Sequence, residues 1–304
     1  SADDLHLAGQ RIEIEAGDRD VEIELLVGID ARVTQLNMVT TSPRPIQPGR
    51  RHLRTLRAGP DEIETVVDTL PKGVRLAEAQ RAVLDTPGGP LRGADAATTD
   101  LAARRFCFRL ASGKTARLTR LAAFHTSRDG ADPMARARRT LRRAGDYECL
   151  RATHERRWAE TWRACDIELE GPDDDQRALR FNLFQLLQAC PEHDSRVSLG
   201  ARGLSGEMHE GSVFWDNEIF KLPFFTFTRP AATASMLRFR HRTLPEARRH
   251  ARDLWFEGAM YAWKSGDDGI EETEMGVGAY YAIHIVADIA YALSYVVHLM
   301  SPAV

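Results

Sequence analysis

The stretch ARGLSGEMHEGSVFWDNEIFKLPFFTFTRP, at residues 201–230, decides how the rest of the chain is interpreted. Its first part contains Gly203, Ser205 and Gly206, a composition that is typical of a loop. Its second part places Trp215 beside Asp216. A flat indole can cover the apolar face of a pyranose, and a carboxylate accepts hydrogen bonds from neighbouring hydroxyls. This pair alone favours a sugar site and a structural tryptophan with a capping aspartate about equally.

A second acidic and aromatic stretch follows, YAWKSGDDGIEET at residues 261–273, and it contains Trp263. Gly266 and Gly269 interrupt regular structure here, and four carboxylates lie between Asp267 and Glu272. Clustered carboxylates can bind calcium, but this run lacks the alternating ligand spacing of an EF-hand loop. The spacing by itself therefore favours a solvated turn.

Helical patterns surround both stretches. One helix begins after Gly171-Pro172, where Asp173 and Gln176 stand in capping-box positions, and ends before Pro191. Its apolar stripe consists of four leucines, Leu179, Leu183, Leu186 and Leu187. We expect further helices at about 214–226, 230–242, 245–256 and 276–300.

The apolar segment Val277–Met300 is long enough to span a bilayer. It also contains His284, Asp288 and His298, which are costly in hydrocarbon. A helix that is apolar all round can equally lie inside a large water-soluble protein. The sequence therefore predicts a buried helix and no membrane span.

Before residue 125 or so, the chain alternates apolar and polar residues. The apolar positions of three such runs are Ile12 and Ile14; Val21, Ile23 and Leu25; and Phe106, Phe108 and Leu110. A period of two with polar partners predicts strands with one solvated face, and hence an antiparallel sheet or sandwich.

A change of period after the strands predicts two linking helices. Asp132-Pro133 has the residues of an N-cap and a first helical position, and Gly145 suits the end. Five arginines lie between them, and we expect a solvated face and no nucleic-acid patch, because no aromatic platform interleaves them. A second helix is expected from Tyr147 to Cys165, with Trp158 and Trp162 packing on one face.

The bulk composition fits an ordinary globular protein of about two domains. The 304 residues are 43% hydrophobic and 28% charged, and the net charge of -3 creates no general attraction to nucleic acid or acidic membranes. Ser1 opens a start with no basic or apolar region, so no signal peptide is expected. The cysteines, Cys107, Cys149, Cys165 and Cys190, form no Cys-x-x-Cys pair, which predicts reduced, buried thiols, no zinc site and a cytoplasmic location.

The order of these stretches resembles glycoside hydrolase family 65, the family of maltose, trehalose and kojibiose phosphorylases. The resemblance is carried by GSVFWDNEIFKLPFFTFTRP (211–230) and GAMYAWKSGDDGIEET (258–273), and extends to RALRFNLFQLLQA (177–189) and, more weakly, RHLRTLRAGPD (51–61). It implies an N-terminal antiparallel β-sandwich at 1–128, a helical linker at 129–170, and the first part of an (α/α)6 barrel at 171–304. It also implies that Trp215 and Asp216 line the subsite of the transferred glucosyl unit, with Trp263 near the same pocket.

The chain departs from the family pattern in two ways. Ser212 stands where the family has a histidine, and Asn217 stands where it has a threonine. The family's catalytic glutamic acid lies in a Gly-Pro-Asp-Glu-Tyr-like motif that this sequence lacks. We therefore expect an interior fragment with no catalytic residue of its own, the acid lying C-terminal to Val304, so that the resemblance leaves open whether the chain is itself an enzyme.

The resemblance implies inverting phosphorolysis of an α-linked glucose disaccharide to β-glucose 1-phosphate and a second sugar. Inorganic phosphate would be the co-substrate, with no cofactor and no metal, and family members are often homodimers. Two alternatives stay open: a hydrolase of the same family, such as an acid trehalase, and an inactive truncated module that binds sugar weakly.

Overall fold

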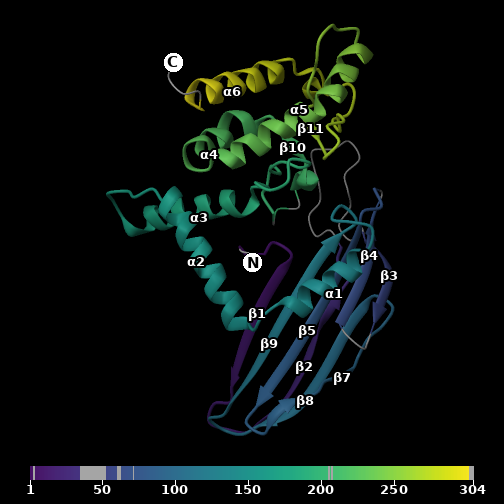
Figure 1. The fold of residues 1–304 in the computed structure, drawn as a ribbon, viewed down its shortest axis with the longest axis vertical. Helices are drawn as coiled ribbons and strands as arrows, with labels where there is room; N and C mark the ends of the chain where they lie inside the picture. Colours follow the sequence, from purple (N-terminus) through teal and green to yellow (C-terminus); the bar gives the residue numbers. More distant parts are fainter. Residues whose placement is uncertain are drawn as a thin grey trace. The chain divides into compact units, whose positions relative to one another are not determined.

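The computed structural model describes residues 1–2, 4–34, 53–59, 63–70, 72–204, 206 and 208–300. They form two compact units, which are divided in sequence after Glu160. The first unit consists mainly of strands and the second mainly of helices (Figure 1). Ser205, Glu207 and Val304, and most of the flanks of 53–59, lie outside the described residues.

The N-terminal unit is an antiparallel β-sandwich. Its larger sheet has the order β1-β9-β5-β4-β3, with β6 paired to β5, and its smaller sheet has the order β2-β8-β7. The strands are β1 Leu7–Glu15, β2 Val21–Asp30, β3 Leu53–Gly59, β4 Ile63–Thr69, β5 Arg75–Thr86, β6 Gly89–Leu91, β7 Ala94–Asp95, β8 Leu101–Leu110 and β9 Thr115–Thr126. The three alternating runs of the sequence fall in β1, β2 and β8, so the expected strands are confirmed.

The core of the sandwich lies between its two sheets. Leu84 and Leu118 of the larger sheet join Val27, Phe106 and Leu110 of the smaller one in a single cluster of buried side chains. Alternate residues of a strand point to opposite faces, which is why Phe106, Phe108 and Leu110 of β8 all contact this cluster.

Helix α1, Pro133–Arg143, packs on the other face of the larger sheet. Its Met134, Ala137 and Leu141 lie against small buried side chains of β5 and β9, including Ala79 and Ala123. The predicted start is confirmed, because Oδ1 of Asp132 accepts a hydrogen bond from the Ala135 N–H at 2.9 Å.

The second unit is mostly helical. The helix α2, Tyr147–Cys165, has the predicted bounds and crosses the division between the units. The other elements are α3 Asp173–Ala189, η1 Met208–Gly211, β10 Val213–Phe214, η2 Asn217–Lys221, α4 Leu222–Thr228, α5 Pro230–Asp253, β11 Lys264–Ser265, η3 Gly278–Tyr281 and α6 His284–Met300. Leu222 and Phe225 pack with Met236 and with Val296 of α6 in one buried cluster.

The expected capping box of α3 is wrong. Pro172 occupies the N-cap position without a side-chain capping bond. Gln176 instead accepts a hydrogen bond from the Leu169 N–H at 2.7 Å and donates to the Ile167 oxygen at 3.0 Å. Its amide thus holds the chain that precedes the helix, a tertiary role that local spacing does not reveal.

Three predicted helix boundaries are also wrong. Helix α5 continues through Pro245, because Phe239 before the proline and Ala247 after it are both buried and hold the two halves in line. The helix expected at 214–226 is divided into a two-residue strand, a π-helical turn and α4. Helix α6 begins only at His284, after a separate 3-10 turn.

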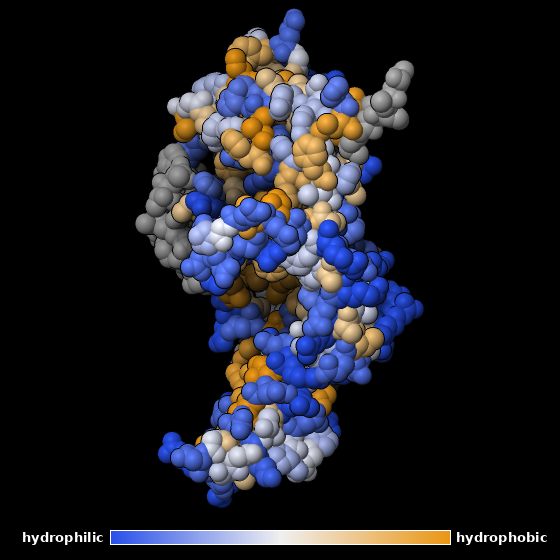
Figure 2. Space-filling view, turned by 90° about the vertical axis from the view of Figure 1, so that its left-hand side faces the viewer, coloured by the Kyte–Doolittle hydropathy of each residue, from blue (hydrophilic) through white to orange (hydrophobic). Residues whose placement is uncertain are grey.

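Helix α6 is buried on one face only, whereas the sequence predicted burial all round. Ile285, Ile289 and Ala292 are buried, but Tyr291 and Val297 are 60% and 55% exposed. Figure 2 shows such hydrophobic residues among polar ones on the surface of the helical unit. In the described part of the chain, no helix is both long and apolar enough to cross a membrane.

The four cysteines are free, but only Cys165 is buried. Cys107 and Cys149 are exposed, which corrects the prediction of buried thiols. Cys107 occupies a solvent-facing position of β8, directly after buried Phe106. Burial raises the pKa of the half-buried Cys190 thiol to about 12.

Candidate functional site

A short antiparallel ladder brings the two aromatic and acidic stretches together. Strands β10 and β11 pair Val213 with Ser265 and Phe214 with Lys264. Trp215 follows β10 directly and Trp263 precedes β11 directly, so both indoles leave the same end of the ladder. Their ring centroids lie 5.9 Å apart with an angle of 55° between the planes.

A third ring, which was not predicted from the sequence, joins the two indoles, and Phe220 also lies 5.9 Å from Trp215. His284 at the start of α6 meets Trp215 edge-on, with centroids 5.1 Å apart, and lies 5.8 Å from Trp263. One signal of this residue is visible in the sequence, a polar side chain within an otherwise apolar run. Its place beside the two tryptophans depends on tertiary structure alone.

The indole nitrogen of Trp215 is buried and has no hydrogen-bond partner. Buried N–H donors almost always have a partner, either in the protein or in bound solvent or ligand. Trp215 therefore offers both an apolar ring face and an unused donor, and a sugar hydroxyl could accept from that donor.

A buried ion pair holds the segment that carries Trp215. Glu218 and Arg240 are joined by two hydrogen bonds of 2.9 and 2.7 Å, and their side chains are 0% and 3% exposed. Arg240 also donates to the backbone oxygen of Phe214 at 2.9 Å. The guanidinium of α5 thus fixes the residues on both sides of Trp215 and Asp216.

Asp216 lies at the start of the π-helical turn η2 and is half-buried. The next residue, Asn217, is buried and donates to the backbone oxygen of Leu199 at 2.8 Å. Lys221 donates to the oxygen of Gly200 at 3.3 Å; burial lowers the pKa of its ammonium group, while the charges of Asp216 and Glu218 oppose that shift. Asp216 is therefore placed on a rigid turn that is anchored to the preceding loop.

That loop contains unusual backbone. His209, Glu210 and Gly211 are consecutive residues with φ of 65°, 57° and 75°. Residues other than glycine rarely adopt this left-handed conformation, and such strain is concentrated at functional sites. Glu210 is held there by Lys264 of β11, with 3.2 Å between Oε2 and Nζ.

The acidic run 267–272 contains the predicted turn, at Asp267 and Asp268, but its two glutamates also form hydrogen bonds with the neighbouring chain. Glu271 accepts hydrogen bonds from the backbone N–H groups of Trp263 and Thr273, at 2.7 and 2.9 Å. Glu272 accepts from the hydroxyl of Ser212 at 2.9 Å. These carboxylates fix the loop that follows Trp263, and Ser212 has a defined role in place of the family's histidine.

Only one group of side chains in the described part of the chain has the composition of a metal site. It lies in the N-terminal unit and consists of His6, His125 and Asp129, whose ligand atoms all lie within 4.8 Å of one another. The two imidazoles are stacked, with centroids 3.9 Å apart and planes at 13°. Parallel rings direct their lone pairs side by side and not toward one point, so we assign no metal here. Burial lowers the pKa of His125.

Two family models match the chain. The model of the glycosyl hydrolase family 65 N-terminal domain covers residues 1–161, and that of the family's central catalytic domain covers residues 180–299. The curated relatives include a kojibiose phosphorylase of Halothermothrix orenii, 44% identical over 54% of this chain and 23% of its own length. A 1,2-alpha-glucosylglycerol phosphorylase of Bacillus selenitireducens is 37% identical over 57% of this chain and 22% of its own length.

A solved structure has the same fold. A human-microbiome protein assigned as a kojibiose phosphorylase superposes with a TM-score of 0.81, over 96% of this chain and 37% of its own, at 23% identity. The chain thus spans less than half the length of these relatives. With a strand-rich unit that matches the family's N-terminal domain and helices that match its central catalytic domain, the chain belongs to glycosyl hydrolase family 65.

Proposed function

We propose that this chain forms the glucosyl-binding part of an inverting disaccharide phosphorylase. The observation that carries the proposal is the aromatic group of Trp215, Trp263 and His284 next to Asp216, with the Trp215 N–H unused. The kojibiose, 1,2-alpha-glucosylglycerol and nigerose phosphorylases among its relatives support an α-linked glucoside as substrate.

In this proposal Trp215 and Trp263 cover the apolar face of the glucosyl unit, and Asp216 accepts hydrogen bonds from its hydroxyls. Holding the ring in this way orients the anomeric carbon for attack by phosphate from the opposite face. Phosphate is already an anion, so the reaction needs a general acid at the leaving oxygen but no general base. A hydrolase on the same scaffold would need a second carboxylate to activate water.

We further propose that residues 1–128 act as a β-sandwich domain and that 129–170 link it to the helical catalytic region. Disaccharide and inorganic phosphate are the proposed ligands, without an organic cofactor, in a cytoplasmic protein.

The test is phosphate-dependent release of glucose 1-phosphate by a full-length protein that carries this chain. Kojibiose, nigerose, maltose and trehalose are each supplied with and without phosphate. The proposal predicts glucose 1-phosphate from at least one of them and little free glucose when phosphate is omitted. Equal glucose release with and without phosphate would instead identify the hydrolase alternative.

A further inference from the structure

The N-terminal unit contains a cavity of about 550 Å³ that has no part in the proposed site. The start of β4 Ile63–Thr69, strands β5, β6 and β8 and the end of α1 line it, and it is partly open to solvent. The floor is apolar and includes Ile63, Leu91 and Phe106. Pockets for small molecules range over about 300–1,000 Å³, so this one could hold a hexose with a substituent.

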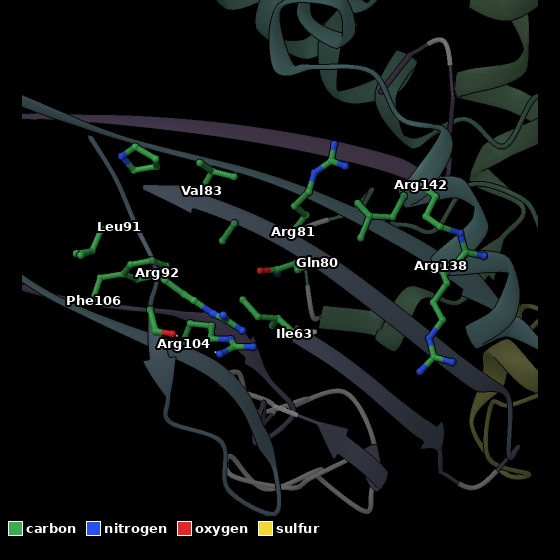
Figure 3. Close-up of a pocket in the computed structure, with 14 residues that line it drawn as sticks. Ile63, Gln80, Arg81, Val83, Leu91, Arg92, Arg104, Phe106, Arg138 and Arg142 are labelled. Carbon is green, nitrogen blue, oxygen red and sulfur yellow. Dashed lines mark hydrogen bonds between the residues drawn. The ribbon is translucent and has the colours of Figure 1, made fainter. Parts of the chain in front are cut away.

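Arginine dominates the polar lining of this cavity. Among the described residues that line it, none is acidic and five are arginines: Arg81, Arg92, Arg104, Arg138 and Arg142. Figure 3 shows the side chains of Arg92 and Arg104 extending toward the part of the cavity where Ile63 and Gln80 lie. Arg81 alternates with Gln80 along β5 and so points to the other face of the sheet, where Arg138 and Arg142 of α1 lie. Arg92 and Arg104 extend toward Gln80, and two guanidinium groups together favour a ligand with several anionic oxygens, above all a phosphate.

The arginines are held in different ways. Arg138 forms two hydrogen bonds of 2.6 Å with Glu64, which is 3% exposed, so much of its charge is used inside the protein. Arg104 donates through one nitrogen to the backbone oxygen of Gly93 at 3.3 Å. A guanidinium has five N–H donors and can bond to a ligand oxygen in addition to its contacts within the protein.

Gln80 presents a buried side-chain oxygen that has no hydrogen-bond donor. Its side chain lines the cavity and is only 6% exposed, and its Oε1 atom has no hydrogen-bond partner. Its amide nitrogen donates to Glu78 at 2.9 Å, which fixes the oxygen as the atom left over. A buried acceptor without a donor points to a ligand that brings an O–H or N–H group.

We propose that this cavity binds a phosphorylated sugar, with the phosphate held by Arg92 and Arg104 and a sugar hydroxyl donating to Oε1 of Gln80. An inorganic phosphate satisfies only the arginines, and an unphosphorylated sugar satisfies only Gln80. The combination of the two chemistries in one cavity of this size selects the sugar phosphate.

The test is calorimetric titration of the chain with glucose 1-phosphate, glucose 6-phosphate, inorganic phosphate and glucose. The use of glucose 1-phosphate rests on the proposed function, and glucose 6-phosphate does not. All titrations are made in the Asp216→Asn background as well, so that binding at the proposed catalytic site is recognised separately. We expect one sugar phosphate to bind at least about tenfold more tightly than phosphate, in both backgrounds and less tightly at high salt.

Arg92→Gln and Arg104→Gln should each weaken that binding about tenfold to a hundredfold, the range of a lost charge-assisted hydrogen bond. Arg105→Gln is the matched control on the same strand, because Arg105 is paired with Glu24 at 3.3 Å and does not line the cavity. Gln80→Leu should abolish the preference over inorganic phosphate. The melting temperature of each variant reports folding, and Arg92 is exposed, so its variant should fold normally. Absence of saturable binding, or equal effects of Arg104→Gln and Arg105→Gln, overturns the proposal.

Discussion

The buried pair of Glu218 and Arg240 should be essential to the helical unit, and Arg240→Met removes one partner while keeping most of the volume. The change leaves the carboxylate of Glu218, which is 0% exposed, without its counter-charge. Breaking a buried pair in this way typically costs about 3–5 kcal/mol. The bond from Arg240 to the Phe214 oxygen adds about 1 kcal/mol, though the two contributions are not strictly additive.

The assay is urea denaturation, monitored by tryptophan fluorescence, of Arg240→Met, a control variant and a double variant. Arg249→Met on the same helix is the control, because Arg249 pairs with Asp253 at the surface and its side chain is 46% exposed. Such a pair contributes no more than about 1 kcal/mol. The double variant Arg240→Met/Glu218→Leu should recover most of the loss, since no charge is left buried. A loss below about 1 kcal/mol for Arg240→Met, or a double variant less stable than the single one, would show that the pair does not stabilise the unit in this way.

Three further outcomes are expected. Burial lowers the pKa of His125 below its ordinary value of 6.5, so the unfolded chain binds a proton at this residue more readily than the folded chain does. The contribution of His125 to stability should therefore be full above about pH 6.5 and fall as the pH drops through that value. In His125→Gln the midpoint of urea denaturation should depend less on pH over this range. The exposed apolar face of α6 should make the chain self-associate, so light scattering should give a mass that rises with concentration, and Val297→Asp should reduce that rise; a monodisperse wild-type monomer would contradict this. The 304-residue chain by itself should release no measurable glucose 1-phosphate from maltose, trehalose, kojibiose or nigerose, because it lacks the family's Gly-Pro-Asp-Glu-Tyr-like acid motif and general acid catalysis contributes about 10²–10⁴ in rate. Sustained turnover by the purified chain would show this expectation to be wrong.

Sequence reasoning succeeded where the cause of a structure is local. Asp132-Pro133 specified the start of α1, because an N-cap oxygen and a proline act on the residues next to them. Helix α2 was predicted with its observed bounds, Tyr147–Cys165. The strands around Ile12 and Phe106 followed from alternation, which burial on one face requires.

The errors arose where distant residues decide the outcome. Pro245 favours an end of one helix and the start of another, but the buried side chains on both sides of it keep α5 continuous. Gln176 reads as part of a capping box, yet it binds the backbone seven and nine residues earlier. Tertiary contacts override local preference in both cases.

Some residues of the candidate site could be predicted from the sequence and others could not. Trp215, Asp216 and Trp263 could be singled out from residue types and family resemblance, and the structure brings the two indoles together. His284 and the Glu218–Arg240 pair could not, because 69 and 22 residues separate the contacting partners along the chain. No pattern of spacing over such distances indicates which side chains meet.

Whether Asp216 and the tryptophans beside it bind a glucosyl unit can be decided by a binding measurement on two variants. Ligand-observed NMR with kojibiose, which detects weak binding, is applied to the chain, to Asp216→Asn and to Trp215→Ala, with the melting temperature of each. A carboxylate that accepts from hydroxyls cannot be replaced by an amide, half of whose polar surface donates. We expect Asp216→Asn to lose at least about tenfold in affinity with an unchanged melting temperature, because a charge-assisted hydrogen bond contributes about 1.5–3 kcal/mol. If Asp216→Asn binds kojibiose as the unaltered chain does, and Trp215→Ala only lowers the melting temperature, Trp215 is a core residue and the sugar site lies elsewhere.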